Sequence, residues 1–422
     1  MAQEMDGRPL RAVLPGFLIA LLLIQTARSA AAEPMTWEDA VRTARGKNPE
    51  VLSADHSRRA AQAAARVSYG DFFPDLAANG GYSDSDAGSG EYSASLSLRQ
   101  TLFSGFSTLA GTERARAQFE GANADYDLTE ARVASDLKKA FAGLLAAQEN
   151  LALTEMIRDR RAENRRLIEL RFEAGRENRG SFLRAKAQES QARFESDRAA
   201  RDLGLSRRTL ARAMGMDDFD ALAATGTLRL QREAPAAEPS RLVAQTPAYR
   251  KQFQSLLGAR AELKGARSGF FPSLSVSGTG QKRGRDFPPD NASWSAGLSL
   301  SYPLFSGGKD FFGVRRAGED LSRSQKDLEN VKRQTGLSLD DAYQGLVNAV
   351  QSATVQKEFL AAARERAEIS RAQYTTGLLS YQDWDQIETD LIDSQKRELA
   401  AARDAAAAEA EWEKIQGKGF IE

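Results

Sequence analysis

The sequence contains one structural unit twice. Phe72-Phe73-Pro74 recurs as Phe270-Phe271-Pro272, and Leu102-Phe103-Ser104-Gly105 recurs in the same order as Leu304-Phe305-Ser306-Gly307. An internal repeat indicates that similar units pack together, so both copies must follow one architecture. We expect a first repeat over residues 33–216, a linker over 217–239 and a second repeat over 240–418.

The N-terminal segment has the three-part pattern of a secretory signal peptide. Two arginines precede an apolar run over residues 12–25, and small residues follow it. An N-terminal membrane anchor is the alternative, but the run is shorter than the roughly 20 residues that a spanning helix needs. We therefore expect residues 1–32 to be removed, with cleavage between about Ala30 and Ala32.

Composition excludes most kinds of catalytic and metal site. The chain has no cysteine and one histidine, His56, so thiolate nucleophiles, Fe–S clusters and paired-histidine metal sites are ruled out. Lys plus Arg and Asp plus Glu both number 58, which gives no electrostatic argument for nucleic acid. We expect a protein that is not an enzyme, with no cofactor, no metal and no nucleic-acid partner.

Each repeat contains a stretch in which apolar and small polar residues alternate. One stretch begins at Tyr92 and the other at Trp294, and a weaker partner follows each Phe-Phe-Pro motif. A period of two residues is typical of strands with one apolar face. We expect β-hairpins over about 75–103 and about 273–305, with the polar face formed by Ser93, Ser95, Ser97, Ser275, Ser277, Ser299 and Ser301.

Four strands with one apolar face permit two kinds of structure. They form one sheet of a soluble sandwich, or they cross a membrane with the apolar face toward lipid and the serines toward water. After the signal, no stretch of the sequence is long and apolar enough for a transmembrane helix. Because four strands cannot close a barrel, a membrane barrel requires several chains.

The pattern after each hairpin is helical. Residues 106–174 and 308–376 contain no proline, and at about 1.5 Å per residue each helix would be roughly 100 Å long. The returning helices end near residues 216 and 417 and are about half that length. The helix before each hairpin, in which Asn48-Pro49 recurs as Thr246-Pro247, supplies the remaining length of one long helix. We expect the two shorter helices to stack end to end beside the long one.

The signal, the tandem repeat, Phe-Phe-Pro before each hairpin, Leu-Phe-Ser-Gly after it and an aromatic-x-x-Gly helical tip together resemble the TolC family of outer-membrane efflux proteins. The resemblance extends from about Thr36 to Lys418. It implies a mixed α and β membrane protein in which a long α-helical barrel is continuous with a transmembrane β-barrel shared among three chains. It also places the protein in the outer membrane of a Gram-negative bacterium, with a large periplasmic extension.

The resemblance further implies a function and partners. The chain would be the exit duct of a tripartite efflux or type I secretion system, passively conducting substrates outward. Its partners would be two identical chains in a homotrimer, a periplasmic membrane-fusion adaptor, an inner-membrane transporter of the RND, ABC or MFS type, and outer-membrane lipid. The alternative is a periplasmic coiled-coil adaptor or another structural helical protein. An adaptor should carry a single helical hairpin within a lipoyl-like β-domain, whereas this chain has two hairpins.

The two helical tips are the candidate functional sites. A glycine in the left-handed conformation should end each long helix, after which Asn178 and Ser380 are placed to cap the returning helices, with Asp383 as a capping-box acid. The resemblance instead implies a ring of three Asp383 carboxylates at a closed periplasmic entrance. Candidate gate residues are Asp383, Asp385, Tyr374 and Ser181, where Asp385 either joins the ring or faces the next helix. Candidate adaptor-docking residues are Gly175, Arg176, Gly377 and Leu378.

Two positions depart from the pattern of the family. The first-repeat counterpart of Asp383 is Ser181, and Leu379 stands where the best-known members have a basic residue that bonds across the gate. An ion-pair contact like theirs is therefore not expected here, and gating should depend mainly on the second tip. Arg176, Glu177 and Arg179 form either different contacts or a solvated turn. The three carboxylates Asp383, Asp385 and Glu388 on one helix are interpreted as a solvated face rather than a catalytic group.

Overall fold

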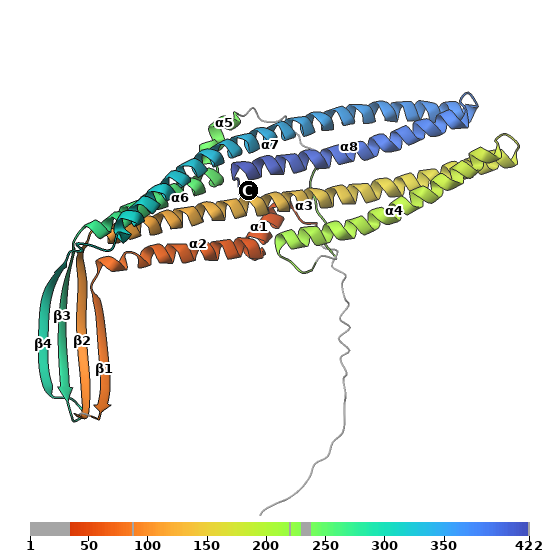
Figure 1. Ribbon diagram of the computed structural model, residues 1–422. Coiled ribbons are helices and arrows are strands. Elements are labelled where there is room, and N and C mark those ends of the chain that lie inside the picture. Colours follow the sequence, from red (N-terminus) through yellow and green to blue (C-terminus); the bar gives the residue numbers. More distant parts are fainter. Residues whose placement is uncertain (1–33, 87, 219–220, 229–237, 421–422) are drawn as a thin grey trace, which may run out of the picture.

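The computed structural model describes residues 34–86, 88–218, 221–228 and 238–420 of the 422-residue chain. The expected signal peptide over residues 1–32 and part of the expected linker lie outside the described residues. The described chain forms long helices that run side by side, and a four-stranded sheet extends from one end of them (Figure 1). The turns of the two helical hairpins lie at the opposite end.

The two repeats have the same order of elements. The first consists of α1 (Trp37–Lys47), α2 (Pro49–Val67), η1 (Gly70–Phe72), β1 (Asp75–Ser85), β2 (Gly88–Ser104), α3 (Ser107–Glu173) and α4 (Arg179–Met214). The second consists of α5 (Pro239–Leu242), η2 (Val243–Gln245), α6 (Pro247–Ala266), η3 (Arg267–Phe270), β3 (Ser273–Gly284), β4 (Asn291–Ser301), α7 (Lys309–Thr376) and α8 (Tyr381–Gln416). The long helices α3 and α7 have 67 and 68 residues.

In the first repeat, α4 and α2 stack end to end beside α3. The Asn48 side chain accepts hydrogen bonds from the first backbone N–H groups of α2, at Glu50 and Val51, and its amide donates to the Ala213 carbonyl near the end of α4 at 2.8 Å. Gly215 ends α4 with a φ of +74° and lies against the backbone of Lys47. A capping asparagine followed by proline thus begins one helix and receives the end of another.

The second repeat uses the same junction with a different cap. Thr246 caps α6 through a bond from the Tyr249 N–H to its hydroxyl, and Pro247 is the first helical residue. Gly417 ends α8 with a φ of +80° and packs on the Pro247 ring. The expected stacking of the shorter helices beside a long one is therefore confirmed in both repeats, as Figure 1 shows.

The helices pack through small residues. In the main cluster, alanines from α1, α3, α4 and α8 surround larger side chains such as Leu137, Leu144, Leu210 and Met214, all of which are fully buried. Alanine combines high helix propensity with a small side chain, which allows long helices to approach closely. No helix in the described part of the chain combines the length and hydrophobicity needed to cross a membrane.

The sheet is an antiparallel meander with strand order β1-β2-β3-β4. β1 and β4 are its edges, and each lacks a partner on its outer side among the described residues. The β2–β3 pairing joins the two repeats, because these strands belong to different copies of the unit. The tandem repeat therefore produces one sheet rather than two separate hairpins.

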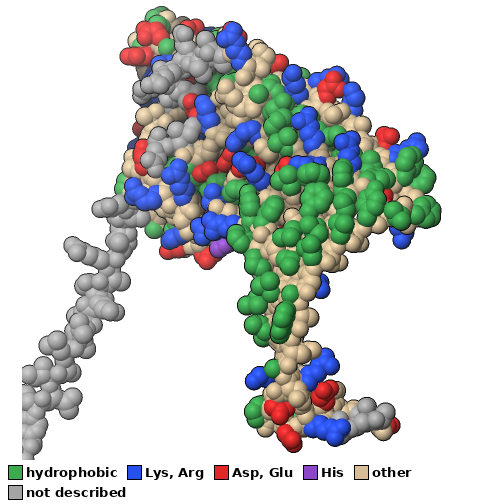
Figure 2. Space-filling view, turned by 90° about the vertical axis from the view of Figure 1, so that its left-hand side faces the viewer, with side chains coloured by type: hydrophobic (Ala, Val, Ile, Leu, Met, Phe, Trp, Pro, Cys, Tyr) green, Lys and Arg blue, Asp and Glu red, His purple; other side chains and the backbone are tan. Residues whose placement is uncertain are grey.

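Register divides the sheet into two chemically different faces. On one face Leu76 lies beside Leu98, Val276 beside Leu298, and Gly280 between Leu96 and Trp294. On the other face small polar residues are neighbours, as in the pair Ser275 and Ser299. The predicted alternation is thus continuous across all four strands. In Figure 2 hydrophobic side chains gather at the junction of the sheet with the helices and along one side of the upper sheet, and charged side chains gather at its free end.

A glycine turn connects the sheet to α3. Gly105, the last residue of the first Leu-Phe-Ser-Gly motif, has a φ of +61°, and a Cβ at this position would lie 2.6 Å from the Ser268 carbonyl oxygen. A side chain would therefore be both strained and obstructed. The glycine lets the chain turn from a strand into a helix directly beside η3 of the other repeat.

Candidate functional site at the helical tips

Both tips end their long helix in the same way. Gly175 and Gly377 have φ values of +69° and +83°. At the second tip the Gly377 N–H donates to the Tyr374 carbonyl at 3.1 Å and the Leu378 N–H donates to the Gln373 carbonyl at 2.9 Å. The first tip has the corresponding bonds. This is the Schellman arrangement, which satisfies the last carbonyl groups of a helix.

The caps expected for the returning helices are confirmed. The Ser181 N–H donates to the Asn178 side chain at 2.9 Å at the start of α4. The Asp383 N–H donates to the Ser380 hydroxyl oxygen at 3.2 Å at the start of α8, and the Ser380 hydroxyl donates to the Asp383 carboxylate at 2.6 Å. Asp383 thus binds the capping hydroxyl, and its side chain is exposed at the positive end of the helix dipole.

An aromatic cluster fixes the second tip to the first. The Tyr374 and Trp384 rings are stacked with centroids 4.4 Å apart, and the Tyr381 ring packs edge-on against both. The Arg171 guanidinium of α3 lies 4.3 Å from the centre of the Tyr374 ring and donates to the Tyr374 and Thr375 carbonyls. Ile168 and Ala185 complete this core.

Burial disfavours ionisation of both tyrosines of this cluster. It raises the pKa of Tyr374 to about 12, against the opposing effect of Arg171, and it raises the pKa of Tyr381 to about 12. The Tyr374 hydroxyl donates to the Glu177 carboxylate at 3.4 Å. Glu177 therefore contacts the second tip, while Arg176 and Arg179 are exposed. Tyr374, predicted as a gate residue, lies in this buried cluster.

Asp385 is the most constrained ionisable residue of the tip. Its side chain is 1% exposed and accepts from Arg161 of α3 at 3.0 Å, from Arg184 of α4 at 2.7 Å and from Gln188 of α4 at 2.7 and 2.9 Å. The second Arg161 nitrogen donates to the Thr389 hydroxyl at 3.0 Å. We call Asp385, Arg161, Arg184 and Gln188 the Asp385 cluster. It joins the start of α8 to the tip end of the first helical hairpin, near the end of α3 and the start of α4.

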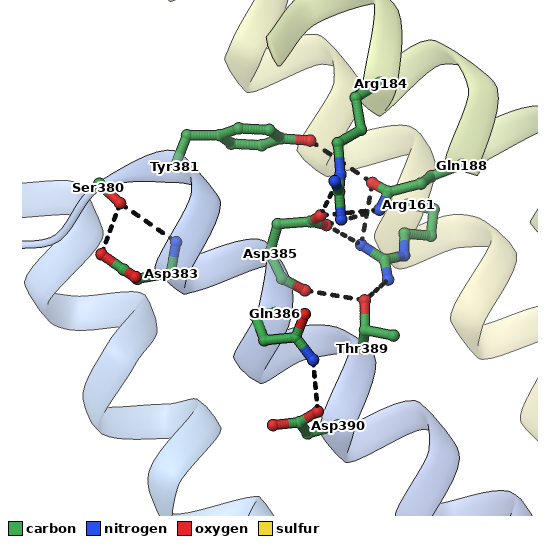
Figure 3. Close-up of polar contacts among 10 residues, drawn as sticks. All are labelled: Arg161, Arg184, Gln188, Ser380, Tyr381, Asp383, Asp385, Gln386, Thr389 and Asp390. Atoms are coloured by element: carbon green, nitrogen blue, oxygen red, sulfur yellow. Dashed lines mark hydrogen bonds and ion pairs between the residues drawn. The ribbon is translucent and has the colours of Figure 1, made fainter.

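Asp383 and Asp385 point to opposite sides of α8 (Figure 3). Two residues along a helix correspond to a rotation of about 200°, so one carboxylate is buried against α3 and α4 while the other is exposed. The exposed side of Asp383 continues through Gln386, whose amide donates to Asp390 at 2.8 Å. Sequence reasoning missed Gln386 and Asp390. Gln386 is three residues after Asp383 and Asp390 is four residues after Gln386, and this spacing is the signal that places them on one face.

The candidate docking residues are accessible. Gly175, Arg176 and Gly377 are exposed, and the Leu378 side chain is 81% exposed. Ser181, the first-repeat counterpart of Asp383, is half-buried within its cap. The two tips are therefore unequal, since only the second carries an exposed carboxylate at this position.

The predicted serine face is assembled by the strand register. Ser95 lies beside Gln281, Ser97 beside Thr279, and Ser277 beside Arg99. Together with Ser93, Ser275, Ser299 and Ser301, these residues lie on the face opposite Leu96 and Leu298. As to metal binding, no group of three or more histidines or carboxylates converges within the ranges that the structure describes.

Comparisons with known proteins agree on the family. The family model described as outer membrane efflux protein matches residues 40–216 and 239–418. The alkaline protease secretion protein AprF of Pseudomonas aeruginosa is 26% identical over 256 residues, which cover 58% of this chain and 52% of AprF. The outer membrane protein OprJ of the same species is 26% identical over 265 residues, which cover 59% and 54%. The matched segments thus span about half the length of these relatives.

Solved structures share the fold over nearly the whole chain. The open state of the MtrE outer membrane channel of Neisseria gonorrhoeae superposes with a TM-score of 0.79 at 20% identity, covering 90% of this chain and 88% of MtrE. The outer membrane protein VceC of Vibrio cholerae gives 0.77 at 18% identity, covering 91% and 96%.

The predicted fold class is confirmed, since the long helical hairpins continue into a four-stranded antiparallel sheet, the unit occurs twice, and outer membrane channels share this fold. The predicted location in the outer membrane of a Gram-negative bacterium is confirmed as well. The chain belongs to the outer membrane efflux protein family.

Proposed function

We propose that the chain is the outer-membrane exit duct of a tripartite efflux or type I secretion system. The observation that carries this function is the sheet, which has one apolar face, one face of small polar residues and two edge strands, and which continues directly into long helical hairpins. A sheet of this kind suits a barrel with lipid outside and water inside. The duct itself is passive, and the energy comes from its partners.

The edge strands support a homotrimer. Neighbouring strands alternate in direction, so β4 of one chain runs antiparallel to β1 of the next when the sheets are placed side by side. Pairing these edges satisfies backbone groups that lipid cannot satisfy. Three chains with four strands each give a barrel of twelve, with the serine face lining the lumen.

Outside the barrel, the helical tips fit the role of a gated periplasmic entrance. The exposed Asp383 side chains of three chains would form a ring of negative charge that attracts cations and narrows the opening. The Asp385 cluster would hold the second hairpin against the first in this closed arrangement.

The tips also offer a surface to a periplasmic membrane-fusion adaptor, which would connect the duct to an inner-membrane transporter of the RND, ABC or MFS type. Leu378 is the clearest candidate because it is apolar and almost fully exposed. Leu378→Ser should leave trimer assembly unchanged and weaken cross-linking to the adaptor. Full adaptor cross-linking in this variant would remove Leu378 from the docking surface.

The function is tested by conductance. Protein extracted in detergent should behave as a trimer, conduct ions in planar bilayers and prefer cations, and Asp383→Asn should reduce that preference while trimers still form. An adaptor or a structural helical protein would show no conductance. A soluble monomer without channel activity would refute the proposal.

A further inference from the structure

A lysine interrupts the apolar face of the sheet. Lys282 of β3 lies on the same face as Leu274, Val276 and Gly280, and its neighbours on the adjacent strands are Ala94 and Ala292. This face is the one that the proposed function directs toward lipid. A cationic side chain is costly there unless its ammonium group reaches the polar boundary of the membrane.

The position of Lys282 along the strand places it at such a boundary. β3 begins beside the helices and ends at Gly284, so Lys282 is near the free end of the sheet. Trp294 is two residues nearer the helices on this face, and Tyr92 is two residues nearer the loop. The centroid of the Tyr92 ring lies 4.8 Å from that of Tyr82 and 5.6 Å from that of Phe287. Aromatic residues of this kind mark the level of lipid headgroups.

A groove leads from the apolar surface to this lysine. It has a volume of about 580 Å³ and a mostly apolar lining that includes Ala94, Leu96, Gly280, Lys282, Ala292 and Trp294. Gly280 leaves its floor open between Leu96 and Trp294, the latter 82% exposed. The groove can therefore receive a hydrocarbon chain along its length, with the ammonium group of Lys282 at one end.

The charge of Lys282 is free to bind an external anion. The described residues that line the groove include no carboxylate, and Lys282 is the cation among them. Arg283, the next residue, belongs to the opposite face and lies beside Ser93 and Asn291. Of these two cations, only Lys282 lines the apolar groove.

We propose that Lys282 and this groove form a binding site for a phospholipid of net negative charge, its phosphate on the ammonium group and one acyl chain between Leu96 and Trp294. The site rests on the proposed function, since it requires the apolar face to contact lipid. It would enrich an anionic lipid beside each chain at the loop end of the barrel.

Trp294 provides a local probe. The protein is reconstituted in vesicles of phosphatidylglycerol and phosphatidylcholine at equal mole fractions, with the acyl-chain bromine on one lipid or the other. Quenching of Trp294 is isolated by subtracting the signal of Trp294→Phe, because the chain contains three other tryptophans. We expect phosphatidylglycerol to be enriched about fivefold over phosphatidylcholine beside Trp294, because one lysine near an anionic headgroup contributes about 1 kcal/mol.

Lys282→Gln should bring this ratio close to one, whereas Arg283→Gln should leave it unchanged. Both side chains are exposed, and unchanged trimer assembly with an unchanged circular dichroism spectrum confirms that each variant is folded. An unaltered ratio in Lys282→Gln, or an equal loss in Arg283→Gln, would overturn the site while the membrane function stands. Absence of quenching by either lipid would instead show that the sheet does not contact lipid, which contradicts the proposed function itself.

Discussion

Asp385→Asn should loosen the second helical tip. The substitution removes the negative charge that faces Arg161, and both side chains are buried, at 1% and 8% exposed. Removing one partner of a buried ion pair costs about 3–5 kcal/mol because the other charge stays buried. Arg184 is 56% exposed and contributes only about 0.5–1 kcal/mol. Since asparagine still accepts a hydrogen bond, we expect the lower end, about 3 kcal/mol.

Hydrogen exchange of the amides in the first turns of α8 measures this loss locally. A cost of about 3 kcal/mol corresponds to a reduction in protection of about 10²-fold where exchange proceeds through local opening. Asp383→Asn is the matched control, because it changes the same charge two residues away on the exposed side of the helix. Its protection should change by less than about tenfold.

Adding Arg161→Gln to Asp385→Asn should restore part of the protection, because it removes the uncompensated buried charge. Trimers carrying Asp385→Asn should also show a higher conductance if the Asp385 cluster holds the tip closed. Unchanged protection in the single variant would refute the reasoning. A loss of protection spread equally over α8 and the sheet would also refute it, because the cluster would then not act locally.

Two further predictions follow from particular contacts. Gly215→Ala should destabilise the helix junction by on the order of 2 kcal/mol or more, since φ is positive and the methyl group would lie 2.7 Å from the Lys47 carbonyl carbon. In the same helix, a methyl group at Gly204 would meet nothing within 4 Å, so Gly204→Ala should leave the melting temperature unchanged or raise it. Equal melting temperatures for the Gly215→Ala and Gly204→Ala variants would contradict this. Burial alone would raise the pKa of Glu195, but bonds from Lys396 and Gln191 lower it below 4.5. The ion pair between Glu195 of α4 and Lys396 of α8 therefore contributes its full stability above about pH 4.5. This contribution is lost as the pH falls through the lower pKa that Glu195 has in the folded protein. Protection near residue 195 should fall on acidification, and Lys396→Gln should abolish that dependence.

Much of the fold could be predicted because its signals are local. Alternation from Tyr92 and Trp294 marks two strands, and register then places their apolar residues on one face. The recurrence of Asn48-Pro49 as Thr246-Pro247 reflects a capped helix start that receives the end of a returning helix. Each of these features depends on residues close in sequence, or on a motif that occurs twice.

The tip could be predicted only in part. The caps at Asn178 and Ser380 follow from residue type and spacing and are confirmed. The partners of Asp385 were not predicted, because Arg161 and Arg184 are 224 and 201 residues away in sequence and only tertiary packing brings them together. Helical geometry could have separated Asp383 from Asp385, since side chains two positions apart face opposite directions.

The central claim is that one face of the sheet lines a water-filled duct, and thiol accessibility in planar bilayers tests it most directly. The protein has no cysteine, so Ser97→Cys and Leu96→Cys each introduce a single reactive group on neighbouring residues of β2. A bulky charged thiol reagent should reduce the current through Ser97→Cys channels and leave Leu96→Cys channels unaffected. Block of the Leu96→Cys channels alone, or of neither, would contradict the account.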